Sequence, residues 1–152
     1  MLTLHTPQDF GKHVGQTIGP TDWRSVSQAD IGGFATLTGD DHWIHVDVER
    51  AARENPGGRT IVHGLYLLSL IPRWQRALFH IERRGAGLLY GYDGVRFILP
   101  IAVDAPIRLC QTVNAVAPHR QGTRIALTSR IETDASDRPA LIAETILLIA
   151  DP

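Results

Sequence analysis

Residues 39–47, with the sequence GDDHWIHVD, bring three carboxylates and two imidazoles into one short stretch. A carboxylate and an imidazole that hold one water molecule between them are sufficient for general acid–base chemistry near neutral pH. Asp40 and His45 are the candidate pair. On an ideal helix their spacing would leave them about 140° apart, so the two side chains converge only if the chain turns after Gly39.

Two apolar residues, Trp43 and Ile44, stand inside the same stretch. They would supply a dry wall, which raises the pKa of a carboxyl group and strengthens the electric field that it exerts. A simpler interpretation stays open. Acidic side chains that follow a helix often cap backbone amides, and Asp40 or Asp41 could do only that.

A metal site is a further alternative for these residues. His42 and His45 form an H-x-x-H pair with carboxylates nearby, and His63 could complete a set of ligands. Histidine spacing of this kind is weak evidence without a clear third ligand, so we expect no metal here.

A second segment with possible chemistry is residues 61–64, IVHG, which precedes a long apolar run. The amides in the first turn of a helix have no partner within the helix and carry a partial positive charge. A glycine there lets a ligand oxygen approach the backbone, so the Gly64 amide could serve as an oxyanion hole. Close packing at the start of the helix would explain Gly64 equally well.

Two short helices are expected to frame the acidic stretch. Ser27 and Asp30 have the spacing of a capping box, and Gly39 is a typical C-terminal stop, which predicts a helix between them. Asp47 is a suitable N-cap for a second helix over residues 48–54.

The rest of the chain predicts one central helix followed by a sheet. Residues 65–79 begin apolar on all sides, which indicates a buried helix that Pro72 kinks or resets. Helices first and then a run of antiparallel strands are typical of the α+β class, and a curved sheet wrapped around the helix would cover it. The expected strands lie near residues 88–98, 101–117, 123–134 and 140–149.

Length and composition indicate one globular domain over residues 1–152, with residues 1–22 as a loose lead-in arm. The formal net charge of -1 offers no general attraction to nucleic acid or to an anionic membrane surface. The single cysteine, Cys110, excludes an internal disulfide and lies in an apolar setting typical of a buried packing residue. Neither a secretory signal nor a membrane span is evident, so the default expectation is a soluble cytoplasmic protein.

Residues 38–47, followed by residues 61–64, resemble the MaoC-like dehydratases, the (R)-specific enoyl-CoA hydratases. The signature of that family runs G-D-x-N-P-x-H and continues with an apolar-His-Gly segment that opens the central helix. The His-Trp variant found here is similar to the branch that contains nodulation protein N. Residues 91–100 also resemble the G-x-x-x-x-R-F-x-x-P strand of the family, and the resemblance covers about residues 20–150.

The resemblance implies a hot dog fold, a bent antiparallel sheet around one long helix, usually paired into a homodimer. It implies a lyase that adds water reversibly to a trans-2-enoyl-CoA and gives an (R)-3-hydroxyacyl-CoA. Asp40 and His45 occupy the positions of the catalytic acid and histidine, and Gly64 the position whose amide holds the thioester oxygen. His63, directly before this amide, is counted with Gly64 among the candidate oxyanion and substrate-binding residues. The acyl-CoA is the substrate, and no metal or redox cofactor is implied.

Several positions depart from the family pattern. His42 and Trp43 replace the commoner Asn and Pro, and we expect His42 to orient the loop. Ser69 could replace a hydroxyl that some members carry along the helix, or it could bond only to its own helix. Arg96 could contact a CoA phosphate or hold the edge of the sheet.

Two other functions remain open at this level. The same fold could hydrolyse acyl-CoA thioesters, or it could bind acyl thioesters without turnover as an oligomeric scaffold. The acyl chain length would depend on a tunnel whose expected walls include Trp43, Tyr66 and residues 51–60.

Overall fold

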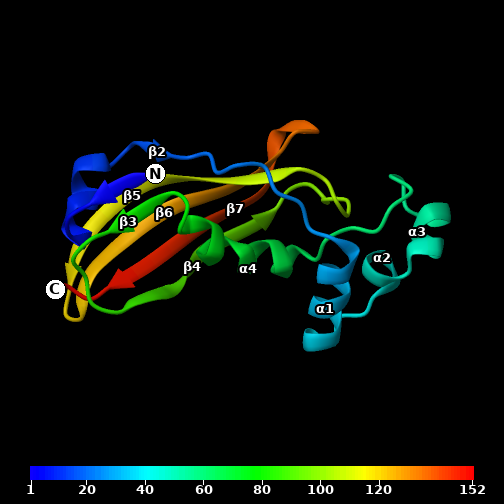
Figure 1. Cartoon of the computed structure of the whole chain (residues 1–152), viewed down its shortest axis with the longest axis horizontal. Helices are drawn as coiled ribbons and strands as arrows, with labels where there is room; N and C mark the ends of the chain where they lie inside the picture. Colours follow the sequence, from blue (N-terminus) through cyan, green and yellow to red (C-terminus); the bar gives the residue numbers. More distant parts are fainter.

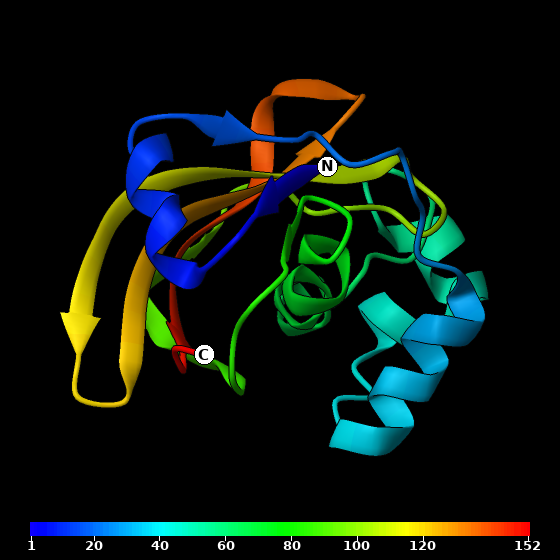
Figure 2. The same ribbon diagram turned by 60° about the vertical axis from the view of Figure 1, so that its left-hand side comes forward.

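The computed structural model describes residues 1–152, and its main feature is a five-stranded antiparallel sheet that curves around the helix α4 (Figures 1 and 2). The strands follow the order β2–β5–β6–β7–β4 across the sheet. Their bounds are Thr17–Ile18 (β2), Gly87–Phe97 (β4), Ile107–His119 (β5), Gly122–Thr133 (β6) and Ser136–Ile149 (β7).

Alternation of side chains decides which face of the sheet is buried. In β6, every second residue from Thr123 to Thr133 is buried and the residues between them are partly exposed. The register aligns Leu127 of β6 with Val113 of β5 and with Thr145 of β7, so the inward side chains of three strands form one layer. This mainly apolar layer requires a cover on its concave side.

Helix α4 (Gly64–Gln75) supplies that cover. It buries Leu67, Leu70, Ile71 and Trp74 against the sheet, whereas Leu65 is 62% exposed. The helix is therefore buried along one side, although the sequence predicts burial all round. It continues past Pro72, which is exposed, and ends at Gln75, before residue 79. No helix of the structure has the length and apolar character needed to span a membrane.

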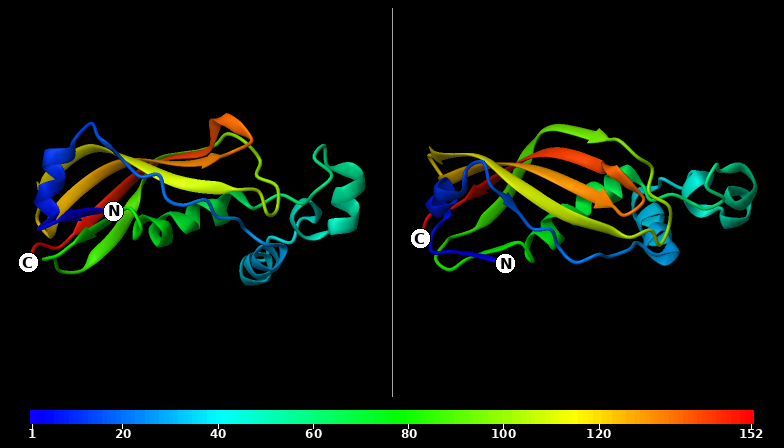
Figure 3. Two further views of the ribbon diagram at one scale, coloured as in Figure 1. Left: turned by 45° about the horizontal axis from the view of Figure 1, so that its top comes forward. Right: turned by 90° about the horizontal axis from the view of Figure 1, so that it is seen from above.

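Helices α1 (Gln28–Thr38), α2 (Trp43–Val46) and α3 (Val48–Glu54) lie together beyond one end of the sheet (Figures 1 and 3). The predicted caps are confirmed: Ser27 and Asp30 form a reciprocal capping box, and the Asp47 carboxylate accepts a hydrogen bond from the Arg50 amide. Gly39 adopts a left-handed conformation with φ of 79° and closes α1. The single turn of α2 has no counterpart in the sequence prediction.

The first 22 residues pack onto the domain instead of forming a loose arm. They contain β1 (Leu2–Leu4), a 3-10 helix η1 (Pro7–His13) and β2, and they bury the side chains of Leu4 and Phe10. Strand β1 pairs in parallel with β3 (Phe79–Ile81), the segment that directly follows α4. Scattered glycines and prolines hide this order at the sequence level because they interrupt any regular apolar spacing.

The four predicted strands are present, with one difference that matters for the site. Residues 101–106 precede β5, and part of this segment pairs with the segment that leads into α4. The Val62 amide donates to the carbonyl of Ile101 at 2.8 Å, and the Val103 amide donates to the carbonyl of Thr60 at 2.9 Å. These bonds join the segment that leads into α4 to the segment that precedes β5.

The turn at Gly39 gives a test of how the acidic segment is positioned. The Gly39→Ala variant should lose about 1 kcal/mol of unfolding free energy, because an L side chain is strained at positive φ although space around the residue is open. The matched variant Gly33→Ala, within α1 and also in open space, should gain up to about 1 kcal/mol. Urea denaturation would measure both changes, and equal effects of the two variants would contradict this role of Gly39.

Candidate active site

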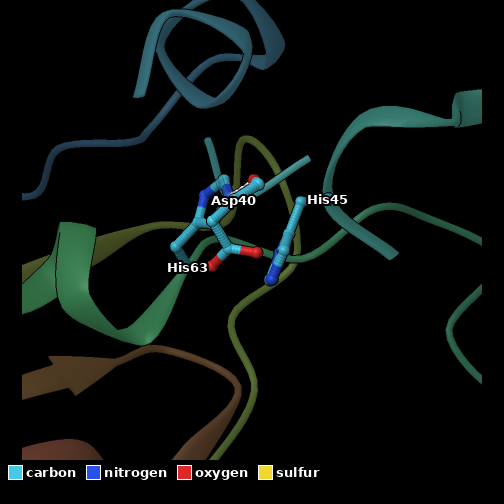
Figure 4. A group of neighbouring side chains, drawn as sticks. All are labelled: Asp40, His45 and His63. Atoms are coloured by element: carbon cyan, nitrogen blue, oxygen red, sulfur yellow. Dashed lines mark hydrogen bonds between the residues drawn. The ribbon is translucent and has the colours of Figure 1, made fainter. Parts of the chain in front are cut away.

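Asp40 lies immediately after the turn that ends α1. The left-handed Gly39 reverses the chain, and the Asp40 amide donates to the Thr38 hydroxyl at 3.3 Å. The Asp40 side chain is exposed and is directed toward the His45 ring (Figure 4). The expected turn after Gly39 is therefore present, and it places the carboxylate on the side of the imidazole.

His45 comes from the single turn of α2 and is 9% exposed. Its Nδ1 lies 2.7 Å from the carbonyl oxygen of Ile61. A carbonyl only accepts hydrogen bonds, so Nδ1 carries the proton and donates it. In the neutral ring this leaves the lone pair on Nε2 available for the groups in front of it.

His63 stands directly behind the pair and is almost fully buried, with 1% exposure. Its Nε2–H donates to the backbone carbonyl of Asp40 at 2.9 Å, and its ring stacks on His45 with centroids 3.8 Å apart. The ring of Phe34 packs against it at 4.9 Å. His63 therefore fixes both the acidic turn and the plane of the neighbouring imidazole.

The three side chains form one cluster, in which a carboxylate oxygen of Asp40 and a nitrogen of each histidine lie within 4.8 Å of one another. These are also ligand types for a metal ion. However, the two imidazole rings are stacked, with only 24° between their planes, and lone pairs that lie in stacked planes do not converge on one ion. The arrangement fits an acid–base pair with a supporting imidazole better than a metal centre.

A cavity of about 360 Å³ opens in front of this cluster. Asp40, His45 and His63 line one side, and Gly64 lies at the start of α4. No side chain caps this helix, so the first-turn amides are available to a ligand. The remaining lining is apolar and comes from Ile61, Val62, Leu65, Leu67 and residues 97–101.

Gly64 also meets a steric requirement. A Cβ atom at this position would come within 2.8 Å of the ring of Phe97. The two interpretations that the sequence left open are therefore compatible, because the same glycine allows close packing and leaves its amide accessible beside the cavity.

Burial lowers the pKa of His45 below its ordinary value, and the neighbouring His63 acts in the same direction. The hydrogen bond to Ile61 and the negative charge of Asp40 oppose this shift. The net lowering favours a neutral imidazole near neutral pH, with the Nε2 lone pair ready to accept a proton.

Comparison with known proteins identifies the family. The family model described as MaoC like domain matches residues 9–135. The chain belongs to the MaoC-like family. The 3-hydroxyacyl-thioester dehydratase Z of Mycobacterium tuberculosis is 34% identical over 148 residues, which cover 97% of each chain. Nodulation protein N of Rhizobium leguminosarum bv. viciae is 35% identical over 144 residues, which cover 93% of this chain and 89% of the relative.

A solved structure supports the same assignment. The (R)-hydratase from A. caviae involved in PHA biosynthesis superimposes with a TM-score of 0.67 and 25% identity, covering 88% of this chain and 94% of that one. The hot dog fold that the sequence resemblance implies is confirmed, and so is the likeness to nodulation protein N.

Three predicted site residues of this MaoC-like protein do not line the cavity. His42 caps α2, where its Nδ1 faces the Ile44 amide at 3.5 Å, and Trp43 packs under the guanidinium of Arg50 at 4.2 Å. Ser69 is exposed and donates to the carbonyl of Tyr66 at 2.7 Å. It therefore bonds to its own helix, which is one of the two roles that the sequence left open. His42 and Trp43 lie between Asp40 and His45 in the sequence, and Ser69 follows Gly64 by five residues, yet none of the three lines the cavity.

The predicted apolar wall of the cavity is also wrong. Neither Trp43 nor Ile44 lines the cavity, and neither do Tyr66 and residues 51–60. Instead, the wall includes Phe97 and the loop after β4, residues 98–101. In the sequence, the R-F-x-x-P motif of residues 96–100 could have indicated this wall. Only the fold shows that the motif lies beside Gly64. Arg96 belongs to the same motif, and the sequence left its role open. It donates to the carbonyl of Val95 and does not line the cavity.

Titration of His45 tests the electrostatics of the cluster. Its imidazole should titrate below the ordinary histidine value, and Asp40→Asn should lower the midpoint further because it removes the opposing negative charge. Since the unfolded chain binds this proton more readily, folding stability should fall as the pH drops through the window between the two pKa values. NMR titration of the ring protons, assigned with His45→Gln, measures the midpoint. An increase in the pKa of His45 in Asp40→Asn would contradict the proposed geometry.

Proposed function

We propose that the chain catalyses the reversible (R)-specific hydration of a trans-2-enoyl-CoA to an (R)-3-hydroxyacyl-CoA. The observation that carries this proposal is the joint presence of the Asp40 carboxylate, the His45 imidazole and the accessible Gly64 amide beside one apolar cavity. The class of enzyme follows from the family: the chain is a lyase of the hydratase and dehydratase type. The (R) stereochemistry is supported by the name of the hydratase from A. caviae.

In the proposed reaction, Asp40 and His45 hold one water molecule over the β-carbon of the enoyl group. Asp40 takes a proton from this water as its oxygen attacks the β-carbon. The proton that Asp40 has taken then passes by way of Nε2 of His45 to the α-carbon, so H and OH of one water are added and both side chains return to their starting state. Positioned acid–base groups of this kind each contribute about 10²–10⁴-fold to the rate.

The Gly64 amide would meet the charge that develops on the thioester oxygen. This amide lies at the N-terminus of α4, where the helix adds a partial positive charge. The apolar walls strengthen that interaction because they exclude water. His63 does not touch the substrate in this scheme; it holds the Asp40 turn through its hydrogen bond to the backbone carbonyl. The scheme requires no metal and no redox cofactor.

Variants of the acid–base pair test the reaction. Asp40→Asn and His45→Gln should each lower hydration of crotonyl-CoA by at least 10²-fold, because each removes one group that holds the water. Loss of the enoyl absorbance measures the rate, and chiral analysis of the product tests the (R) configuration. Asp41→Asn is the matched control, since Asp41 is exposed and does not line the cavity.

The same assays separate the alternative functions. Release of free thiol from an acyl-CoA, without loss of enoyl absorbance, would indicate a thioesterase. Binding of the thioester without turnover would indicate a scaffold. Full activity of either Asp40→Asn or His45→Gln, with circular dichroism unchanged from the parent, would refute the proposed mechanism.

The working form in this proposal is a cytoplasmic homodimer that pairs through β4. This strand is the last one of the sheet, so its outer backbone edge has no partner in the chain. Leu88, Tyr90 and Phe97 on it are 59%, 59% and 51% exposed. An exposed apolar edge strand is a ready template for a second copy in antiparallel pairing.

A charge on this edge should separate the two copies. Leu88→Glu is expected to convert the dimer to a monomer, because pairing would bury the carboxylate of each copy against the apolar edge of the other. Size-exclusion chromatography with light scattering measures the mass. Leu37→Glu is the matched control, since Leu37 is 85% exposed and belongs to α1, which lies beyond the end of the sheet (Figure 1). A monomeric parent protein would contradict the dimer.

A further inference from the structure

The side chain of Gln28 joins three segments around the candidate site. Gln28 is the first residue of α1 and is partly buried. Its amide Nε2–H donates to the backbone carbonyl of His45 at 2.8 Å, and its Oε1 accepts a hydrogen bond from the Thr60 hydroxyl at 2.5 Å. A carbonyl only accepts and a hydroxyl can donate, so these two partners fix the orientation of the amide. Gln28 therefore links α1 to the turn of α2 and to the segment that leads into α4.

The carbonyl of His45 needs such a donor. It lies in the single turn of α2, Trp43–Val46. The last carbonyls of a helix have no amide partner within that helix, and a four-residue helix is too short to be stable by itself. Gln28 supplies the donor from a position 17 residues earlier in the chain. The place of the His45 backbone thus depends on a side chain of another helix.

Thr60 anchors the other end of this link. Its side chain belongs to a residue that is only 1% exposed, and its backbone carbonyl accepts a hydrogen bond from the Val103 amide at 2.9 Å. The next residue, Ile61, carries the carbonyl that receives the Nδ1–H of His45. Residues 60 and 61 therefore hold the ring of His45 directly and its backbone through Gln28.

Gln28 and Thr60 do not belong to the cavity itself. Neither residue lines it, whereas Asp40, His45 and Gly64 do. Any effect of Gln28 or Thr60 on the reaction must therefore pass through His45. Such an effect can be large, because a displacement of about 1 Å at a catalytic group can cost about 10²-fold in rate.

We propose that Gln28, held by Thr60, is a positioning residue that sets the place of the His45 imidazole for the hydration reaction. The inference rests on the proposed function and adds to it two residues outside the cavity. Loss of the Gln28 contacts releases the turn of α2. The start of α4 keeps its own anchor, since the Val62 amide bonds to the carbonyl of Ile101. We therefore expect kcat to depend on Gln28 more strongly than KM does.

The first test removes the polar groups of this link one at a time. Gln28→Met keeps the length of the side chain without its hydrogen bonds, so kcat for crotonyl-CoA should fall about ten-fold or more while KM changes less than about two-fold. Thr60→Val removes the hydroxyl and should also lower kcat, whereas Thr60→Ser retains the hydroxyl and should keep kcat near that of the parent.

Thr123→Val is the matched control for the loss of a buried hydroxyl. Thr123 is 2% exposed and donates to Asp151 at 2.8 Å. It pairs with Ile149 at the end of the sheet opposite to Phe97, so its loss should lower stability and leave kcat unchanged. An equal loss of kcat in Thr123→Val would overturn the inference, because general destabilisation would then explain the effect.

The double variant Gln28→Met/Thr60→Val shows whether the two residues act as a unit. If Thr60 acts through Gln28, its substitution should cause no further loss of kcat once Gln28 is replaced. If the losses of the two single variants multiply instead, Thr60 acts independently of Gln28, and the inference is overturned.

NMR of the ¹⁵N-labelled protein follows the position of His45 without reference to activity. The hydrogen-bonded Nδ1–H of His45, assigned with His45→Gln, should shift or broaden in Gln28→Met and stay unchanged in Thr123→Val. Gln28→Asn serves for the same measurements if Gln28→Met does not fold, since its amide is one methylene too short to reach both partners.

The outcomes separate the two levels of the proposal. A folded Gln28 variant with the parent kcat, or with an unchanged His45 signal, would overturn the inference and leave the proposed function intact. A parent protein that hydrates no enoyl-CoA would refute the proposed function and this inference together.

Discussion

The hydrogen bond from His45 Nδ1 to the carbonyl of Ile61, at 2.7 Å, is the contact on which the site depends. It fixes the tautomer of the imidazole, because a carbonyl can only accept a proton. It also joins the turn of α2 to the segment that leads into α4. If this contact were lost, a buried ring nitrogen would be left without a partner, which costs about 1–3 kcal/mol. One bond therefore orients the His45 imidazole and holds together the two segments that carry the candidate site.

The curved sheet makes that bond possible by holding the segment of Ile61 in place. The Ile61 amide donates to Ile44, the Val62 amide donates to Ile101, and the helix that follows buries its apolar side on the sheet. The helices α1 to α3 add the other half of the site from beyond the end of the sheet (Figure 3). Burial of the apolar core thus stabilises a rigid backbone, and this backbone sets the distances between the polar groups.

The two cavities of the molecule differ in the charge of their walls. The catalytic cavity is rich in apolar walls and lacks cations, whereas the cavity at the far end of α4 is lined by cations that have no acidic partner. Both open along β4, the strand whose outer edge is free.

The sequence by itself determined the features that depend on local backbone chemistry. The capping box of Ser27 and Asp30, the turn at Gly39 and the Asp47 cap all follow from short-range hydrogen bonds and from the conformational freedom of glycine. The family motif likewise predicted Asp40, His45 and Gly64 as site residues, and all three line one cavity. Only the tertiary structure decided which residues surround them. His42, Trp43 and Ser69 are close in sequence yet do not line the cavity, and Phe97 is distant in sequence yet packs on Gly64. The physical reason is that cavity walls come from contacts between segments, and their directions depend on how the sheet curves around α4.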